Sequence, residues 1–123
     1  MDFKKNVLII GSGPNAVKAA DLETAYDAIV VINNAWRVRP DWTHLIYPFD
    51  FPKERWPHDI KLSQSAITEK EFVPIQNQYG GFIYAGATMA FTAGYWALGA
   101  LRPSHISFIA VSYTHLTLPT TWL

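Results

Sequence analysis

Two short runs of aliphatic residues, joined by a glycine-rich segment, constrain the fold of this chain more than any other feature. Residues 6–10 (Asn-Val-Leu-Ile-Ile) and 27–32 (Asp-Ala-Ile-Val-Val-Ile) are apolar except for their first residue. A strand that is apolar on both faces is typical of the centre of a parallel sheet. The intervening residues 11–26 match the length of one crossover connection that contains a helix. The two runs therefore predict a βαβ unit.

The rest of the chain extends this unit into a larger sheet. The further elements expected are a short strand at 43–47, the start of a helix at 68–71, a loop at 76–81, a long helix at 87–101 and a strand at 106–110. This order predicts an α/β fold with a Rossmann-like, doubly wound and mainly parallel sheet. The proline- and aromatic-rich residues 39–58 are expected to form loops on the ligand side of that sheet.

Charge and composition argue against several classes of function. The chain has 123 residues with ten basic and ten acidic side chains, so its net charge is zero. That balance argues against binding to nucleic acid, which a basic face usually marks. The absence of cysteine excludes disulfides, thiolate catalysis and cysteine metal sites. Lys4 and Lys5 lead directly into the first strand, unlike a signal peptide, so a cytoplasmic location is expected.

One stretch of the chain could also cross a membrane. Residues 82–101 contain no charged side chain and are long enough to span a bilayer. Glycines and threonines lower the hydropathy of this stretch. The surrounding strand–helix–strand pattern favours a buried helix of an α/β domain instead. We therefore expect no stable membrane insertion.

A glycine-rich turn joins the first strand to the first helix. Gly11, Ser12, Gly13, Pro14 and Asn15 follow the strand directly, and Asn15 could cap the helix. Glycines let the backbone approach a ligand, and N–H groups at a helix N-terminus can bind phosphate or ribose oxygens. With the alanine at position 16, the spacing matches the dinucleotide fingerprint in its alanine-ended form. A tight turn without a ligand is the structural alternative.

Two amides follow the second strand. Asn33 stands where a dinucleotide site would carry an acidic residue for the ribose hydroxyls, which argues against that kind of site. In a parallel sheet Asn33 and Asn34 lie beside the glycine turn, and each offers a donor and an acceptor to ribose or base. They could equally form a turn.

Small residues open the long helix at Gly86, Ala87 and Thr88. They form a second place where a ligand can approach backbone amides. Close packing of the helix on the sheet is the alternative.

Charged and imidazole side chains in the middle of the chain give further candidates. Arg37 could pair with a phosphate or a carboxylate, or could cover the neighbouring indole as a solvated side chain. His44 and His58 lack metal-ligand spacing and are expected to be packing or surface residues. No metal site is expected.

The last residues do not continue the strand–helix pattern. Residues 111–120 read Val-Ser-Tyr-Thr-His-Leu-Thr-Leu-Pro-Thr and resemble, without a break, the translation of a transposase adapter used in DNA sequencing. Residues 1–110 are therefore expected to form an incomplete, nucleotide-binding Rossmann-like domain, and residues 111–123 a non-biological tail. The alternative is a genuine strand in which threonine and leucine alternate.

The motifs together resemble a family of enzymes. An aliphatic strand, a Gly-x-Gly-Pro turn and an Asn at the end of the second strand are similar to bacterial sialyltransferases that use a CMP-activated sugar, and to related glycosyltransferase-like proteins. Residues 86–88, the Ala-Leu-Gly at 97–99 and the strand at 106–109 fit the same layout. Ser12 stands in place of the family's usual Asn, and Asn15 in place of its Ser.

The resemblance implies a transfer of a sugar from a nucleotide donor to a hydroxyl acceptor. The glycine turn (11–15) would contact the nucleotide phosphate and ribose, Asn33 and Asn34 the ribose or cytosine, and residues 86–88 would flank the nucleotide. No cofactor other than the nucleotide-sugar donor is implied. The family's general base is a His in a later segment, so the catalytic residues stay unknown and the chain alone is expected to be inactive. Two alternatives are an FAD- or NAD-binding oxidoreductase domain and a non-catalytic nucleotide-binding or interaction protein.

Overall fold

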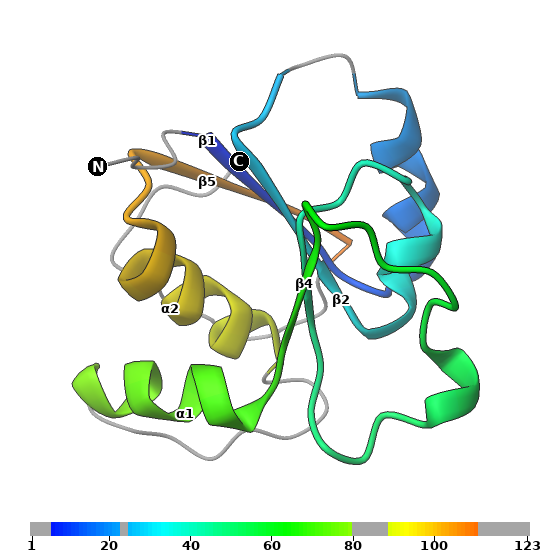
Figure 1. Ribbon diagram of the computed structural model, residues 1–123. Helices are drawn as coiled ribbons and strands as arrows, with labels where there is room; N and C mark the ends of the chain where they lie inside the picture. Colours follow the sequence, from blue (N-terminus) through cyan, green and yellow to red (C-terminus); the bar gives the residue numbers. More distant parts are fainter. Residues whose placement is uncertain (1–5, 23–24, 80–88, 111–123) are drawn as a thin grey trace.

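Five parallel strands form one sheet at the centre of the molecule (Figure 1). The computed structural model describes residues 6–22, 25–79 and 89–110. The strands are β1 (Asn6–Ile10), β2 (Ala28–Ile32), β3 (His44–Ile46), β4 (Ser65–Ile67) and β5 (His105–Ile109). Their spatial order is β4-β3-β2-β1-β5, and every pairing among them is parallel. The expected α/β, Rossmann-like and mainly parallel sheet is therefore confirmed.

The strand order reverses at β1. From β1 the chain moves outward through β2, β3 and β4, and then returns to the other side of β1 as β5. In open parallel sheets, ligands bind outside the carboxyl ends of the strands at such a point of reversal. The carboxyl ends of β1 and β5 are followed by Gly11 and Ala110, which places the glycine turn at this position.

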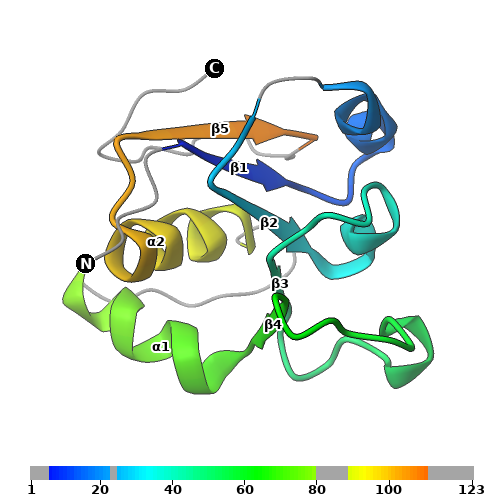
Figure 2. The same cartoon turned by 45° about the horizontal axis from the view of Figure 1, so that its top comes forward.

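Helices cover the two faces of the sheet (Figure 2). The α-helices α1 (Glu69–Gln78) and α2 (Met89–Leu101) lie on one face. The 3₁₀ helices η1 (Pro14–Asp21) and η2 (Asn33–Arg37) lie on the other, and the short 3₁₀ helix η3 (Lys53–Arg55) lies in the connection from β3 to β4. This two-sided cover explains why the central strands can be apolar at successive positions.

The core is divided by the sheet into two clusters. Successive side chains of a strand point to opposite faces. Val7 and Ile9 of β1 therefore pack toward α1 and α2, together with Phe72 of α1. Leu8 and Ile10 pack toward η1 and η2. These four side chains of β1 are at most 1 % exposed, so β1 is enclosed on both faces after its exposed first residue.

Two buried polar side chains join α1 to α2. The Gln76 amide Nε2 donates to Oγ1 of Thr92 at 2.9 Å, and both residues are buried. The N-terminus of α1 is fixed by Thr68, whose N–H donates to Oε1 of Glu71 at 2.8 Å. Thr68 and Glu71 thereby form a capping box. The expected start of a helix at 68–71 is confirmed, whereas the loop expected at 76–81 is wrong for residues 76–78, which belong to α1.

One other expectation about local structure is wrong, and one strand was not predicted. Asn15 does not cap the first helix, because η1 already begins at Pro14 and Gly13 occupies the N-cap position. Proline is favoured at a first helical position, where its missing N–H has no intrahelical partner to lose. The strand β4 was not expected, because two of the three residues in Ser65–Ile67 are exposed and its sequence carries no apolar run.

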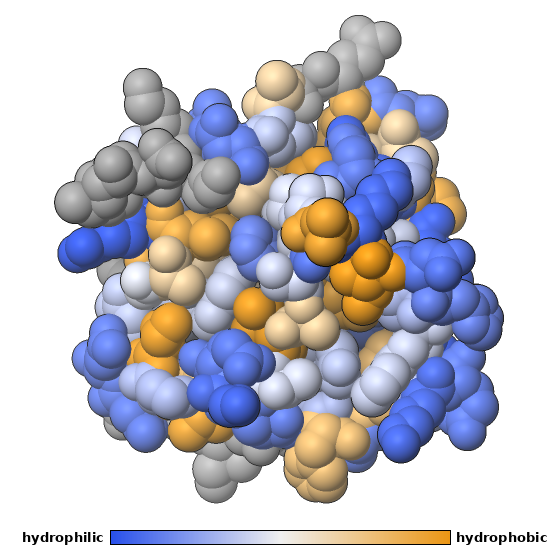
Figure 3. All heavy atoms as spheres, viewed as in Figure 1, coloured by the Kyte–Doolittle hydropathy of each residue, from blue (hydrophilic) through white to orange (hydrophobic). Residues whose placement is uncertain are grey.

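The described residues contain no helix long and apolar enough to cross a membrane. Most of the uncharged stretch at 82–101 is α2, a largely buried helix packed on the sheet and on α1. On the face shown in Figure 3, apolar side chains form small patches among hydrophilic ones. Residues 80–88 and the tail at 111–123 lie outside the described part.

Candidate functional site

The glycine turn is closed onto the end of β5. The Gly11 N–H donates to the carbonyl of Ile109 at 2.8 Å, and the Gly13 N–H donates to the carbonyl of Ala110 at 3.1 Å. A Cβ added to Gly13 would stand 2.8 Å from that Ala110 oxygen. A glycine is therefore required at position 13 by the neighbouring backbone, whatever else binds at this turn.

The remaining residues of the turn face solvent. Ser12, Pro14 and Asn15 are exposed, and no hydrogen bond involves the Ser12 side chain within the described ranges. Ala110 has a positive φ of 60°, which is uncommon for a residue with a Cβ. The end of β5 and the turn after β1 thus form a tight corner at the point where the strand order reverses, with an exposed serine hydroxyl beside it.

Asn33 and Asn34 carry the least satisfied polar groups near the turn. Both residues open η2 directly after β2, and the Oδ1 atom of each is buried without a hydrogen-bond partner among the described residues. Buried carbonyl oxygens are usually paired, and leaving one unpaired costs about 1–3 kcal/mol. Asn33 also has a positive φ of 52°, which asparagine tolerates better than most residues. Backbone strain and unpaired polar atoms of this kind cluster at functional sites, which makes the end of β2 a candidate site.

Asn33 lines a cavity of about 240 Å³ at the carboxyl edge of the sheet. The other lining residues come from the connection after β3 and from the start of α2: Pro48, Asp50, Phe51, Pro52 and Met89. The sequence did not single out Asp50 as a binding residue. Its position after the third strand was the available signal, because the carboxyl ends of parallel strands meet at one edge.

Tyr47 holds the connection that carries Asp50 in place. Its buried ring lies 5.4 Å from that of Phe51 and 5.5 Å from that of Trp56. Burial raises the pKa of the Tyr47 phenol, and the negative charges of Glu71 and Glu69 raise it further. The phenol therefore stays neutral and serves in packing.

The structure brings together only some of the predicted site residues. The glycine turn and the Asn33–Asn34 pair follow the adjacent strands β1 and β2, at the same edge of the sheet. Gly86, Ala87 and Thr88 lie outside the described residues. Met89, which directly follows them, reaches the cavity beside Asn33.

Arg37 and His44 each pack against a tryptophan ring. The Arg37 guanidinium lies 5.3 Å from the centre of the Trp36 ring, as expected for an arginine that covers an aromatic side chain. The ring of His44 packs 5.1 Å from that of Trp96, and its Nδ1 is 2.8 Å from Oγ1 of Thr43. Within the described ranges no three His, Asp or Glu side chains gather as a metal site would require.

Arg39 links η1 to the connection between η2 and β3. Its guanidinium donates to the backbone carbonyl of Ala19 in η1 at 3.2 Å and to both carboxylate oxygens of Asp41, at 2.9 Å and 2.8 Å. The hydrogen bonds from Arg39 lower the pKa of the Asp41 carboxyl below its ordinary value of 3.8. Arg39 therefore fixes the end of η1 to the connection before β3.

The lowered pKa of Asp41 predicts a pH-dependent contribution to stability. A carboxyl with a lowered folded-state pKa stabilises the protein above its unfolded pKa, and this contribution is lost as the pH falls through the folded pKa. The Asp41 side chain is 56 % exposed, so Asp41→Asn should cost less than about 1 kcal/mol at neutral pH. Urea unfolding should show the wild type and Asp41→Asn converging as the pH falls below 3.8. Glu54→Gln, a change at an exposed carboxylate, should show no such convergence.

Comparisons of the chain with protein-family models, with curated proteins and with solved structures found no match.

Proposed function

We propose that this chain binds a nucleotide at the carboxyl edge of its sheet, and that this nucleotide belongs to the activated-sugar donor of a glycosyltransferase similar to bacterial sialyltransferases. The observation that carries the proposal is the pair of buried Oδ1 atoms of Asn33 and Asn34, which have no hydrogen-bond partner among the described residues. They follow β2, next to the strand at which the order of the sheet reverses. A ligand hydroxyl or amine that donates to these oxygens would remove the cost of leaving them unpaired.

The chemistry of this edge suits a ribose or a base. Each asparagine amide offers an acceptor and two donors without a charge. Asp50, in the same cavity as Asn33, adds a carboxylate that can accept hydrogen bonds from hydroxyl or amino groups. The exposed Ser12 hydroxyl in the glycine turn is available to a phosphate oxygen.

Three features argue against a dinucleotide site at the same turn. The N–H groups of Gly11 and Gly13 already donate to the carbonyls of Ile109 and Ala110, so they are not available to a pyrophosphate. The following helix, η1, is a 3₁₀ helix and not the α-helix whose N-terminus binds phosphate in dinucleotide folds. Asn33 also lacks the negative charge that holds the ribose hydroxyls in an NAD site.

In the proposed reaction a base deprotonates the acceptor hydroxyl, and the oxygen of the acceptor displaces the nucleotide from the sugar. The neutral hydrogen-bond donors at this edge would orient the departing nucleotide phosphate. We assign no catalytic base within the described residues. The proposal for this chain therefore concerns the binding of the donor nucleotide.

Replacing Asn33 with glycine tests the site with little change to the fold. Glycine accepts the φ of 52° at this position, and the substitution removes an oxygen that has no partner within the described part. We expect CMP to bind the wild-type chain and Asn33→Gly to weaken binding about tenfold, which corresponds to the loss of one good hydrogen bond. Isothermal titration calorimetry measures both affinities. Asn77→Gly, at an exposed position in α1, should leave CMP binding unchanged.

The same titrations with NAD and FAD address the oxidoreductase alternative. Asn33→Asp supplies the acidic residue that a dinucleotide site uses at this strand end. Binding of NAD or FAD that becomes tighter in Asn33→Asp would overturn the proposal in favour of an oxidoreductase domain. A wild-type chain that binds none of the three nucleotides would favour an interaction protein that shares the fold.

A further inference from the structure

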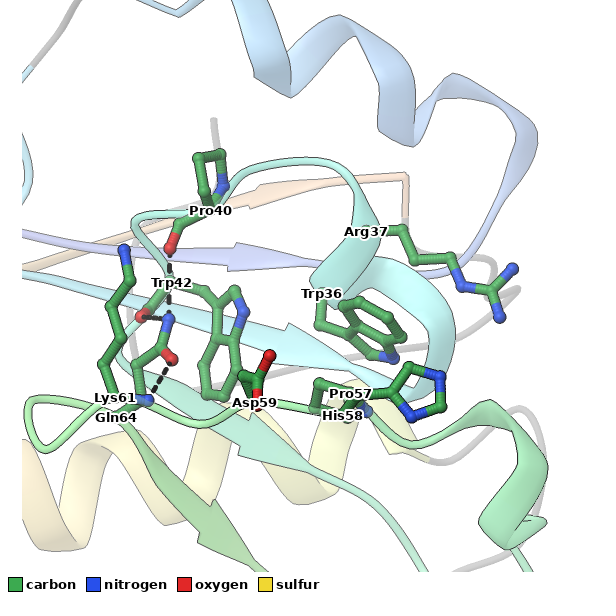
Figure 4. A pocket seen from close by; sticks show the side chains of 9 residues that line it. All are labelled: Trp36, Arg37, Pro40, Trp42, Pro57, His58, Asp59, Lys61 and Gln64. Atoms are coloured by element: carbon green, nitrogen blue, oxygen red, sulfur yellow. Dashed lines mark hydrogen bonds between the residues drawn. The ribbon is translucent and has the colours of Figure 1, made fainter.

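A second pocket, of about 400 Å³, lies on the η2 side of the sheet (Figure 4). It is formed between the connection from η2 to β3 and the connection from η3 to β4. Trp36 lines it from η2, Trp42 from the connection between η2 and β3, and His58, Asp59 and Lys61 from the connection between η3 and β4. Its volume falls in the range of about 300–1,000 Å³ that is typical of small-molecule sites.

The walls of this pocket are held by hydrogen bonds that, among the described residues, use neither the Asp59 carboxylate nor the Lys61 ammonium group. Gln64 donates from Nε2 to the carbonyls of Pro40 and Trp42, at 3.1 Å and 3.0 Å, and accepts from the Lys61 N–H at 3.0 Å. The Trp36 indole donates from Nε1 to the Arg55 carbonyl at 2.8 Å. The two connections are thereby fixed to each other before any ligand binds, which lowers the entropy lost on binding.

The side chains that line the pocket combine an aromatic ring with hydrogen-bond donors and acceptors. The Trp42 indole is only 4 % exposed, so Trp36 supplies the accessible ring, and the Arg37 guanidinium lies 5.3 Å from the centre of that ring. In the view of Figure 4 the Asp59 carboxylate lies between the indoles of Trp36 and Trp42. An indole face carries negative charge density, which attracts the weakly positive C–H groups of a ring stacked on it. Asp59 accepts hydrogen bonds, while Lys61 donates them, and His58 can do either.

A sugar ring can use both the aromatic ring and the hydrogen-bonding side chains of this pocket. One side of a pyranose is covered by C–H groups, and its hydroxyls both donate and accept hydrogen bonds. A proline-rich peptide would also stack on aromatic side chains, yet its rings carry no group that uses Asp59 and Lys61. We infer that the pocket bounded by Trp36, Trp42, Asp59 and Lys61 is a saccharide-binding site. This inference does not depend on the nucleotide site, because the two cavities have no lining residue in common.

The experiment is a titration of the full chain with methyl glycosides of glucose, galactose and N-acetylglucosamine at millimolar concentrations. Tryptophan fluorescence and saturation-transfer NMR report binding. We expect at least one glycoside to bind, and Asp59→Ala and Trp36→Ala each to weaken it about tenfold or more. Two matched controls, Glu54→Ala and Trp56→Ala, remove an exposed carboxylate and an indole that do not line the pocket. Both controls should retain the wild-type affinity.

Three results would overturn the inference. The first is that no glycoside binds the folded wild-type chain. The second is that Asp59→Ala and Glu54→Ala change the affinity equally. The third is that a proline-rich peptide binds this pocket and the glycosides do not. CMP affinity should be unchanged in Asp59→Ala, and glycoside affinity unchanged in Asn33→Gly, so the failure of one site is distinguished from the failure of the other.

Discussion

Replacing Gly13 with valine is expected to lower the free energy of unfolding by about 3 kcal/mol, because the turn leaves no room for a side chain. A Cβ at this position would stand 2.8 Å from the Ala110 carbonyl oxygen. That oxygen belongs to the backbone and already accepts the Gly13 N–H bond, so a rotamer change cannot move it away. The φ of −68° and ψ of 169° at Gly13 suit any residue, so the loss comes from this contact and not from backbone strain.

Urea unfolding followed by circular dichroism measures the effect of Gly13→Val. Ser12→Val is the matched control, since it adds the same side chain at the neighbouring, exposed position of the turn. We expect the control to stay within about 0.5 kcal/mol of the wild type, as surface substitutions usually do. Equal losses in the two variants would show that the closure of the turn onto β5 is not what requires glycine at position 13.

Replacing Thr92 with valine is expected to cost about 2 kcal/mol, although the two side chains have nearly the same shape. The Oγ1 of Thr92 accepts the Gln76 Nε2 bond at 2.9 Å, and the two residues are 0 % and 2 % exposed. Valine would leave the Gln76 amide buried without this acceptor, and a buried donor without a partner has lost its interaction with water as well. Thermal unfolding should show a lower midpoint for Thr92→Val.

A double variant separates this polar cost from a packing defect. Gln76→Leu combined with Thr92→Val removes both members of the pair, so no unpaired amide remains between α1 and α2. We expect the double variant to be more stable than Thr92→Val alone, because replacing both partners with apolar groups can be nearly neutral. A double variant whose loss equals the sum of the two single losses would mean that the hydrogen bond contributes no coupling energy.

The apolar strands were the most predictable part of the fold. Residues 6–10 and 27–32 had to be buried on both faces, and they form β1 and β2 with boundaries that differ by at most one residue. The three-residue β4 could not be predicted, because Ile67 is its only buried side chain and its place in the sheet depends on backbone pairing with β3. Gln76 likewise gave no signal, since a polar residue is buried only where a distant partner, here Thr92, meets it.

The residues of the candidate site that follow strands could be predicted, whereas contacts between residues far apart in the sequence could not. Asn33 and Asn34 were expected at the carboxyl edge because they follow an apolar strand, and they lie there. The contact of Gly13 with Ala110 was not predictable, because it joins residues from opposite ends of the described chain. The sequence therefore could not show that the Gly11 and Gly13 amides donate to the carbonyls of Ile109 and Ala110.

The position of β5 beside β1 has a consequence for how the chain folds. β1 begins at Asn6, and the partner on its outer side begins at His105. During synthesis at about 5–20 residues per second, β1 and β2 leave the ribosome seconds before β5 does. Until then, the backbone groups on one edge of β1 stay unpaired. Closing so long a loop is entropically costly and slows folding. The nascent protein is therefore most prone to aggregation during that interval, before β5 pairs with the first strand.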